Sequence, residues 1–177
     1  MKIAIIGYSG AGKSTLAEKL SHCYSIPKLH MDTLQFQPGW QDSDREWMLT
    51  EMKNFLTKHE AWVIDGNYSW CCYEERMQEA DQIIFLNFSP WTCLFRAFKR
   101  YLTYRGKVRE SMAAGCPERF DWDFIRWILW DGRTKNAKER YQRFQETYPD
   151  KVIVLRSQKE MDHFLENLVH NKKNQRA

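Results

Sequence analysis

The sequence lacks the features that would export the chain or hold it in a membrane. No apolar run approaches the roughly 20 residues that span a bilayer, and the N-terminal MKIAIIG has no long apolar region of the signal-peptide type. The five cysteines include no C-x-x-C pair and no zinc-binding spacing, and Cys71 and Cys72 are adjacent. These absences predict a cytoplasmic protein with reduced thiols and no membrane partner.

Internal repeats and linkers are also absent, so the sequence predicts one folded domain over residues 1–171. A content of 43% hydrophobic and 28% charged residues is typical of a globular chain that buries a core. Residues 172–177 form a short basic tail that we expect to be disordered.

Charge is distributed unevenly along the chain. Residues 1–88 contain 8 Lys and Arg against 12 Asp and Glu, whereas residues 89–177 contain 19 against 11. The second half is therefore either a solvated basic surface or one that faces an anionic partner, and phosphates and nucleic acid are the two candidates.

The most specific motif is GYSGAGKS at residues 7–14, which matches every fixed position of a phosphate-binding P-loop. An apolar run at 3–6 precedes it, and residues 14–20 follow with leucines four apart, as in a strand and a helix. The glycines allow successive N–H groups to point at phosphate oxygens, and the helix N-terminus adds partial positive charge. We therefore expect a nucleoside triphosphate, ATP, to be bound by Gly7, Tyr8, Ser9, Gly10, Ala11, Gly12, Lys13, Ser14 and Thr15.

Short β-branched runs alternate with helical stretches, which is the pattern of a parallel sheet covered by helices. The expected strands are 3–6, 28–32, 61–65, 82–88 and 151–155. The expected helices are 14–20, 45–58, 73–80, 90–104, 122–148 with a break as an alternative near Asp131, and 159–169. Segment 34–40 is expected to be a loop. The sequence thus predicts an α/β, three-layer P-loop NTPase fold with a five-stranded parallel sheet, helices on both faces and a lid-like insertion.

Asp65 is the first candidate outside the P-loop. It closes a strand of the form Trp-Val-Ile-Asp, as a Walker-B aspartate does, so Ser14 and Asp65 are the predicted Mg²⁺ ligands. A capping role before a Gly-Asn turn is the alternative.

Asp32 ends the second expected strand, so it would lie across the phosphate site from Asp65. There it would accept the proton of an attacking hydroxyl or assist Mg²⁺, with a turn or capping role as the alternative. We expect nearby His30 to pack rather than to catalyse. Phe36 and Trp40 follow in the loop, where they form either core or a stacking wall for a base or sugar.

Basic residues gather after the fourth expected strand. Arg96 and Arg100 lie four apart on one helix face, and further cations follow in the irregular segment 105–121. Arginines that close over a transferring phosphoryl group stabilise its negative charge, although a solvated basic face is the alternative. The predicted catalytic set is Lys13, Asp32, Arg96, Arg100, Arg105 and Arg109.

The helix expected at 122–148 adds weaker candidates. Arg126 and Arg133 lie on it and would have to reach back to the phosphate site. Trp127 and Trp130 are three apart, so we expect both to lie in the core.

These residues, in this order, resemble the nucleotide-kinase branch of P-loop proteins, which includes adenylate kinase, shikimate kinase and gluconate kinase. The resemblance implies an acceptor-binding segment at 32–60 and an arginine-bearing lid at 105–121. A closer likeness, to the bacterial DNA topology modulation proteins, covers nearly the whole chain through MKIAIIGYSGAGKSTLA, LHMDTLQFQPGW, WVIDGNY, ADQIIFL, RYLTYRGKVR, GCPERFDWDFIRWILWDGR and PDKVIVL. Asn67-Tyr68 departs from the adenylate kinase pattern, so the resemblance does not imply AMP as the acceptor.

The residues and the resemblance together predict an ATP-binding, Mg²⁺-dependent, kinase-like phosphotransferase of the nucleotide or small-molecule type, with an unidentified phosphoryl acceptor. One alternative is an ATP-dependent nucleic-acid-binding protein that affects DNA topology, which the basic second half favours. Another is a non-catalytic ATP switch. The kinase is the preferred interpretation because no helix-turn-helix or other nucleic-acid-reading motif is evident.

Overall fold

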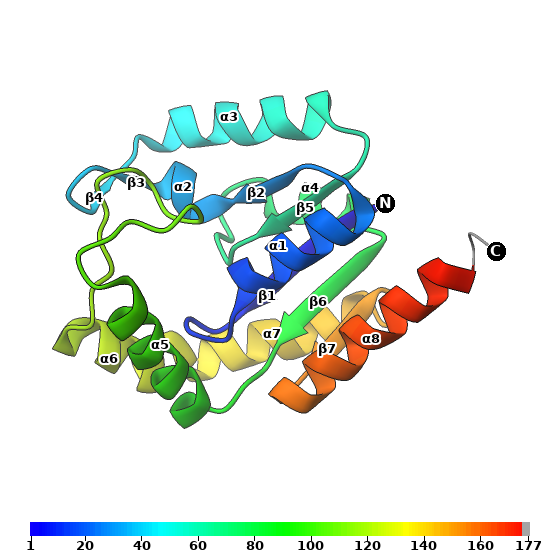
Figure 1. Cartoon of the computed structure of the whole chain (residues 1–177). Helices are drawn as coiled ribbons and strands as arrows, with labels where there is room; N and C mark the ends of the chain where they lie inside the picture. Colours follow the sequence, from blue (N-terminus) through cyan, green and yellow to red (C-terminus); the bar gives the residue numbers. More distant parts are fainter. Residues whose placement is uncertain (175–177) are drawn as a thin grey trace.

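The computed structural model describes residues 1–174 and confirms the predicted α/β architecture (Figure 1). The sheet contains β1 (Lys2–Gly7), β2 (Lys28–His30), β5 (Trp62–Asp65), β6 (Gln82–Leu86) and β7 (Val152–Leu155). All of these strands pair in parallel, in the order β2-β5-β1-β6-β7. The central strand β1 is buried apart from its first residue, because helices cover both of its faces.

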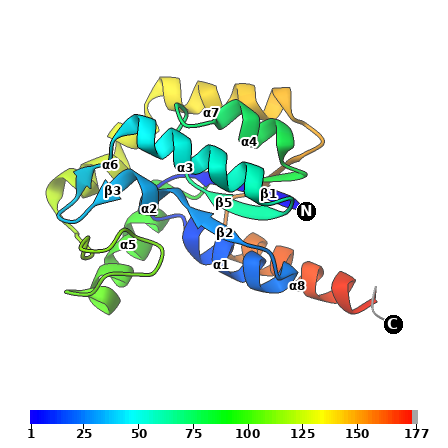
Figure 2. The same cartoon turned by 90° about the horizontal axis from the view of Figure 1, so that it is seen from above.

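Helices form a layer on each face of the sheet (Figures 1 and 2). One face carries α1 (Lys13–Tyr24) and α8 (Gln158–Asn174), and the other carries α3 (Arg45–Lys58), α4 (Tyr73–Glu79) and α7 (Lys135–Thr147). Beyond one end of the sheet lie α5 (Pro90–Tyr104) and α6 (Trp122–Leu129). Within residues 1–174, no helix is both long and apolar enough to cross a membrane.

The two helices at the end of the sheet begin at side-chain caps that the sequence supplies. Ser89 accepts a hydrogen bond from the Thr92 N–H and is followed by Pro90, a residue favoured at the first helical position. Asp121 accepts from the Phe124 N–H at the start of α6. These caps fix where the chain enters α5 and where it re-enters regular structure after the irregular segment.

The predicted strand 28–32 is too long, because β2 ends at His30. Asp32 instead lies in the first turn of the short helix α2 (Met31–Gln35). The partner strand β5 ends at Asp65, which pairs with His30, so no ladder remains for the next residues. Their backbone groups are satisfied in a helical turn instead, where the Phe36 N–H bonds to the Asp32 carbonyl.

The predicted loop 34–40 contains regular structure. After α2 the chain forms a hairpin of β3 (Phe36–Gln37) and β4 (Gln41–Asp42). The Trp40 N–H closes its turn on the Gln37 carbonyl at 3.1 Å, and Trp40 itself has a φ of 64°, which is unusual for a residue with a side chain. We call residues 36–42 the hairpin.

The break expected in helix 122–148 is present, since the 3₁₀ turn η1 (Asp131–Arg133) separates α6 from α7. The disorder expected from residue 172 is wrong up to Asn174, because α8 continues to that residue. Neither Gly nor Pro occurs in α8 to end it earlier. Residues 175–177 lie outside the described part of the chain.

Candidate active site

A cleft of about 1600 Å³ opens at the carboxyl ends of the strands, where ligands bind in folds of this type. Its lining falls into two sides. The P-loop side comprises residues from 8–15, Asp65, α5, the region 127–141 and Gln158. The hairpin side comprises residues from α2 and the hairpin, from 66–70, and from the segment 109–119 together with Arg100.

The P-loop has the backbone conformation that its glycines permit. Gly12 precedes α1 with a φ of 96°, and Gly10 has a φ of 80°. A Cβ on Gly10 would lie 2.4 Å from the Cys93 carbonyl oxygen, so only glycine fits between the loop and α5. The loop therefore leads directly into the N-terminus of α1, as an anion-binding loop requires.

Lys13 folds back over the loop. Its ammonium donates hydrogen bonds to the carbonyl oxygens of Gly7, at 3.0 Å, and of Tyr8, at 3.3 Å. Burial lowers the pKa of the Lys13 ammonium, and the negative charges of Asp32 and Asp65 act in the opposite direction. The charge is thus held where phosphate oxygens would replace the two carbonyl contacts.

Ser14 and Asp65 lie together beneath the loop. The Ser14 hydroxyl donates to Asp65 Oδ2 at 2.9 Å, and the other carboxylate oxygen pairs with Nδ1 of His30. Asp65 is 4% exposed, and His30, which was expected to pack, is also buried. His30 therefore packs and at the same time orients the Asp65 carboxylate, a contact that the sequence pattern does not reveal.

A Mg²⁺ ion suits this pair of groups. A hydroxyl oxygen and a carboxylate oxygen are hard ligands, and Mg²⁺ commonly takes one or two protein oxygens and completes its shell with waters and substrate phosphates. Residues 1–174 contain no group of three or more His, Cys, Asp or Glu side chains that could hold a metal ion. The chemistry of their two oxygens suits Ser14 and Asp65 to a Mg²⁺ ion that arrives with a phosphate ligand.

Asn67 fastens the start of the P-loop to the loop after β5. Its side-chain oxygen accepts from the Gly7 N–H at 3.0 Å, and its side-chain nitrogen donates to the Gly7 carbonyl. This role of Asn67 was not predicted from the sequence. Its position two residues after Asp65, beyond the end of a strand next to β1, is the signal that would have indicated it.

Arg96 belongs to the P-loop side. Its guanidinium lies 5.0 Å from the centre of the Phe88 ring and donates to the Gln158 side-chain oxygen at 2.8 Å. An added Cβ on Gly12 would lie 2.4 Å from the Arg96 Nη2 atom, so this arginine touches the P-loop backbone. Burial lowers the pKa of Arg96.

Arg100 and Arg109 meet on the hairpin side, at a carboxylate that the sequence analysis missed. Arg100 donates to Glu118 Oε2 at 2.9 Å, and Arg109 donates to the other oxygen of the same carboxylate. Glu118 is 8% exposed. Burial and the neighbouring charge of Arg109 lower the pKa of Arg100, and Glu118 opposes this shift.

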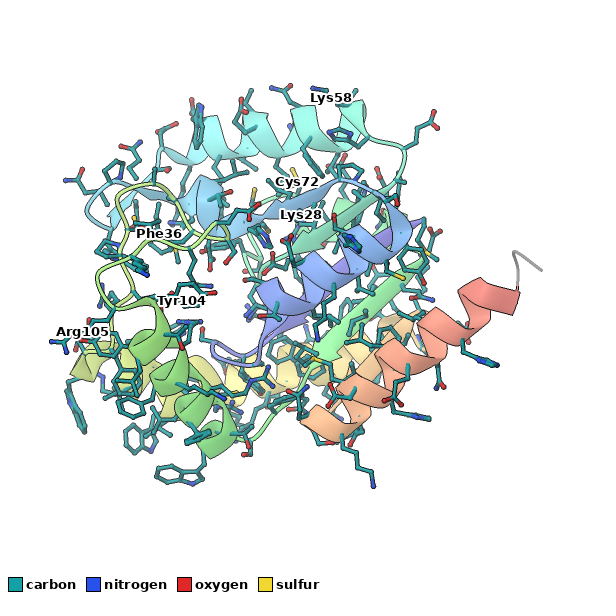
Figure 3. All side chains as sticks on the ribbon, viewed as in Figure 1. Lys28, Phe36, Lys58, Cys72, Tyr104 and Arg105 are labelled. Carbon is teal, nitrogen blue, oxygen red and sulfur yellow. The ribbon has the colours of Figure 1, made fainter. Side chains whose placement is uncertain are left out.

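Arg105 and Arg126 are not brought into this constellation. Arg105 is exposed at the end of α5, outside the lining of the cleft, and Figure 3 shows it at the outer edge of the molecule. Arg126 pairs with Asp131 at 2.8 Å on an exposed surface. Exposed ion pairs of this kind contribute little to stability.

Arg133, in contrast, does reach back to the P-loop. Its guanidinium lies 3.7 Å from the centre of the Tyr8 ring, and its Nη2 donates to the Phe88 carbonyl at 3.0 Å. The 3₁₀ turn that breaks the predicted helix carries this arginine, so the break serves to hold the first half of the loop.

The expectation that Trp127 and Trp130 lie in the core is wrong, since they are 50% and 56% exposed. Helix α6 turns Ile128 into the core instead, and Trp127 faces the cleft. There its indole N–H donates to the Ser9 hydroxyl at 3.1 Å. Periodicity identified an amphipathic helix but not which of its large side chains would be covered.

Asp32 lies in the lining of the hairpin side. Its Oδ1 accepts a hydrogen bond from the Tyr68 hydroxyl at 2.7 Å. Burial, followed by the charge and hydrogen bond of Asp32, raises the pKa of Tyr68, so the phenol remains a donor. Tyr68 was not predicted as a site residue.

The hairpin and the irregular segment 105–121 pack against each other (Figure 1). The Gly39 N–H donates to the Gly115 carbonyl at 3.0 Å, and the Trp40 indole donates to the Pro117 carbonyl at 3.2 Å. An arginine of the segment, Arg119, lies 5.4 Å from the Trp40 ring centre. The two segments therefore form one wall of the cleft.

Comparison with known proteins supports the fold assignment. The sequence matches no protein-family model and no curated protein. Three solved structures are similar over almost their whole length: a gluconokinase from Sinorhizobium meliloti 1021 (TM-score 0.51, 18% identity, 98% of this chain and 96% of that chain), a deoxyadenosine kinase from M. mycoides (0.52, 19%, 100% and 100%) and a shikimate kinase from Bacteroides thetaiotaomicron (0.52, 18%, 98% and 98%). The chain thus shares the fold of P-loop kinases.

Proposed function

We propose that the protein is an ATP- and Mg²⁺-dependent kinase that transfers the γ-phosphoryl group to a small molecule bound on the hairpin side of the cleft. One observation carries the proposal: a single cleft holds the Lys13 ammonium and the Ser14–Asp65 pair on one side and the Arg100–Glu118–Arg109 cluster on the other. A protein that only binds a triphosphate needs the first group but not the second.

On the P-loop side, the backbone N–H groups of residues 7–15 and the Lys13 ammonium would hold the β- and γ-phosphates. Ser14 and Asp65 would hold Mg²⁺, which, when bound, neutralises charge on the phosphate oxygens. Arg96 lies against the same loop and would add positive charge beside it.

On the hairpin side, Asp32 would contact the acceptor. If the acceptor attacks through a hydroxyl group, the Asp32 carboxylate accepts its proton, while the hydrogen bond from Tyr68 keeps the carboxylate in place. Arg100 and Arg109, which Glu118 holds in place, would stabilise charge on the transferring group through their electric field without binding it directly. Arg105 would act only after a movement of the lid-like segment, because it lies outside the cleft.

In this proposal residues 1–171 act as one kinase-like domain, with 32–60 as the acceptor-binding segment and 105–121 as the lid. The likeness to DNA topology modulation proteins is a narrower proposal that rests on the sequence alone. The alternatives to the kinase function are a direct action on DNA and a non-catalytic ATP switch, and neither requires the Asp32–Tyr68 pair in the cleft.

The proposal is tested by ATP consumption with Mg²⁺ and a panel of nucleosides, nucleoside monophosphates, sugars, small hydroxy acids and DNA. We expect ADP to form only with an acceptor, and Lys13→Ala to lower the rate by about 10²- to 10³-fold or more. Asp32→Asn should retain ATP binding and lose turnover by about 10²- to 10⁴-fold if the acceptor is an alcohol. ATP consumption that requires DNA would favour an ATP-dependent protein that acts on DNA. No ATP consumption with any acceptor would favour a non-catalytic ATP switch.

A further inference from the structure

The charged side chains that line the hairpin side of the cleft balance one another: the cations are Arg100, Arg109 and Arg119, and the anions are Asp32, Asp42 and Glu118. Arg100 and Arg109 share the buried carboxylate of Glu118, whose side chain is only 3% exposed. A phosphomonoester bound here would have to displace one or both arginines from Glu118. It would then lie next to a buried carboxylate, and two anions in one poorly solvated site repel each other strongly.

The other cations on or next to this side do not offer a better phosphate site. Arg119 pairs with Asp121 at 2.6 Å, and Lys99, on the neighbouring helix α5, is exposed to solvent, where screening weakens its field. Recognition of a phosphate normally uses charge-assisted hydrogen bonds from arginines that are available to the ligand. The hairpin side is therefore suited to an uncharged ligand.

The walls of the same side are aromatic. Phe36 and Trp40 contact edge to face, with ring centres 5.2 Å apart, and Tyr68 and Trp70 do so at 6.5 Å. All four line the cleft and are only partly buried. The chain holds Trp40 at a positive φ that costs energy, and its contacts with the lid-like segment keep it there. Partly exposed rings fixed in this way suit a planar ligand.

Gln35 specifies a further feature of that ligand. Its side-chain nitrogen donates to Asp42 Oδ1 at 2.8 Å, and this contact fixes the orientation of the amide because a carboxylate only accepts. The amide oxygen is buried and has no hydrogen-bond partner among the described residues, although Gln35 lines the cleft. An unsatisfied buried acceptor is costly, and an N–H group of a ligand would satisfy it once the lining opens enough to expose the oxygen.

We infer that the phosphoryl acceptor is an uncharged nucleoside-like molecule, which combines a planar heterocycle carrying an N–H group with an alcohol. The heterocycle lies between the two aromatic pairs and donates to Gln35, and the alcohol faces Asp32. In the reaction the alcohol oxygen bonds to the γ-phosphorus and its proton passes to the Asp32 carboxylate. The bond from the γ-phosphorus to the bridging oxygen breaks, and its electron pair stays on ADP. This inference rests on the proposed kinase function.

A binding experiment tests the nucleoside-like ligand separately from the proposed kinase function. Isothermal titration calorimetry, with a non-hydrolysable ATP analogue and Mg²⁺ present, would compare purine and pyrimidine nucleosides with their 5′-monophosphates and with sorbitol. We expect at least one nucleoside to bind at least tenfold more tightly than its monophosphate and than sorbitol. Tighter binding of a monophosphate or of sorbitol, or no binding of any nucleoside, would overturn the inference.

Transfer from γ-labelled ATP completes the distinction. Transfer to a nucleoside supports both ideas. Transfer to a monophosphate or a sugar instead of a nucleoside supports the proposed kinase function but contradicts a nucleoside-like acceptor. Binding of nucleosides without transfer to any acceptor contradicts the kinase, and with it the role of the nucleoside as an acceptor.

Variants test the two recognition features directly. Gln35→Ala should weaken nucleoside binding at least tenfold. Gln37→Ala should leave it unchanged, because Gln37 is an exposed glutamine of the adjoining hairpin and lies outside the cleft lining. Equal effects would contradict the role of Gln35.

Glu118→Gln should free Arg100 and Arg109, and therefore shift the preference toward the monophosphate at least tenfold. Glu110→Gln is the matched control, since Glu110 is an exposed glutamate of the same segment. An unchanged preference in a folded Glu118→Gln variant would overturn the charge argument. If thermal melting shows that this variant is unfolded, the inference is decided by the comparison of Gln35→Ala with Gln37→Ala and by the preference of the wild-type protein for nucleoside over monophosphate.

Discussion

The two sides of the cleft are built differently. The P-loop side is fastened to the sheet, because Asn67 and Asp65 at the end of β5 bond to Gly7 and Ser14, and β1 itself runs into the loop. The hairpin is instead held to the irregular segment 105–121 by the hydrogen bonds of Gly39 and Trp40 and by a small apolar cluster of its own. That cluster comprises Met112, Ala113 and Cys116, with Phe36 and Trp40 packed against it.

This difference assigns different properties to the two halves of the site. A triphosphate has the same shape in every reaction, so a rigid site formed by buried strands suits it. An acceptor must enter and leave, and segments with few buried contacts open at lower free energy than core strands. We therefore expect the hairpin and residues 105–121 to move as one unit against a fixed P-loop.

Among the changes that compare the two sides, the largest effect is expected on the P-loop side. Lys13→Ala should lower kcat by about 10²- to 10³-fold or more, because it removes a preorganised charge from the transferring group. Lys19→Ala is the matched control, since Lys19 is exposed on the same helix. A steady-state assay of ADP formation measures both. Comparable losses in the two variants would mean that the effect comes from α1 as a whole.

Asp65→Asn should affect the same side through the metal. We expect the Mg²⁺ concentration for half-maximal binding of an ATP analogue to rise about 10- to 100-fold. The reason is that an amide oxygen carries no negative charge for the cation. Asp150→Asn, at an exposed position, provides the control. An unchanged Mg²⁺ dependence would leave Asp65 with a structural role only.

Two glycines test how the hairpin side is held together. Gly106 and Gly115 both have positive φ, so alanine at either adds strain of about 1 kcal/mol or more. Only at Gly115 would the new Cβ also meet Pro38, at 2.8 Å, whereas nothing lies within 4 Å at Gly106. Gly115→Ala should therefore separate the hairpin from the segment.

Hydrogen exchange of the Gly39 amide, which bonds to the Gly115 carbonyl, measures that separation. We expect faster exchange in Gly115→Ala than in Gly106→Ala, with unchanged affinity for an ATP analogue in both. Equal exchange in the two variants would show that the segments are not held together by this contact.

The smallest expected effect is a proton uptake. Because burial lowers the pKa of Lys13, part of the population is deprotonated in alkaline solution, and bound phosphates raise that pKa again. Binding of an ATP analogue should therefore take up more protons as the buffer becomes more alkaline, and affinity should fall as pH rises through the lowered pKa. Calorimetry in two buffers of different ionisation enthalpy measures the uptake, which should disappear in Lys13→Ala.

The sequence predicts the P-loop side of the cleft far better than the hairpin side. The P-loop is one contiguous motif, and Asp65 is identified by its position at the end of a buried strand, so local rules reach both. Glu118 contacts Arg100, 18 residues away in the chain, and Tyr68 contacts Asp32, 36 residues away. Glu118 and Tyr68 themselves lie in irregular segments, where no periodicity predicts a contact. Their roles depend on tertiary packing.

Asp32 shows how the same limit affects secondary structure. Its neighbours read as a continuing strand, but the edge strand β2 can continue only as far as its one partner does. The length of that partner is a property of the sheet and not of residues 28–32. The short helix that results holds Asp32 in the lining of the cleft.

The central claim is that a phosphoryl group passes from the P-loop side to a molecule on the hairpin side. ³¹P NMR of ATP, Mg²⁺, the protein and the nucleoside panel tests it most directly, with Lys13→Ala as the blank. The account predicts ADP together with a new phosphomonoester resonance in equal amounts. Inorganic phosphate as the only product, or ATP that stays intact with every acceptor class, would contradict it.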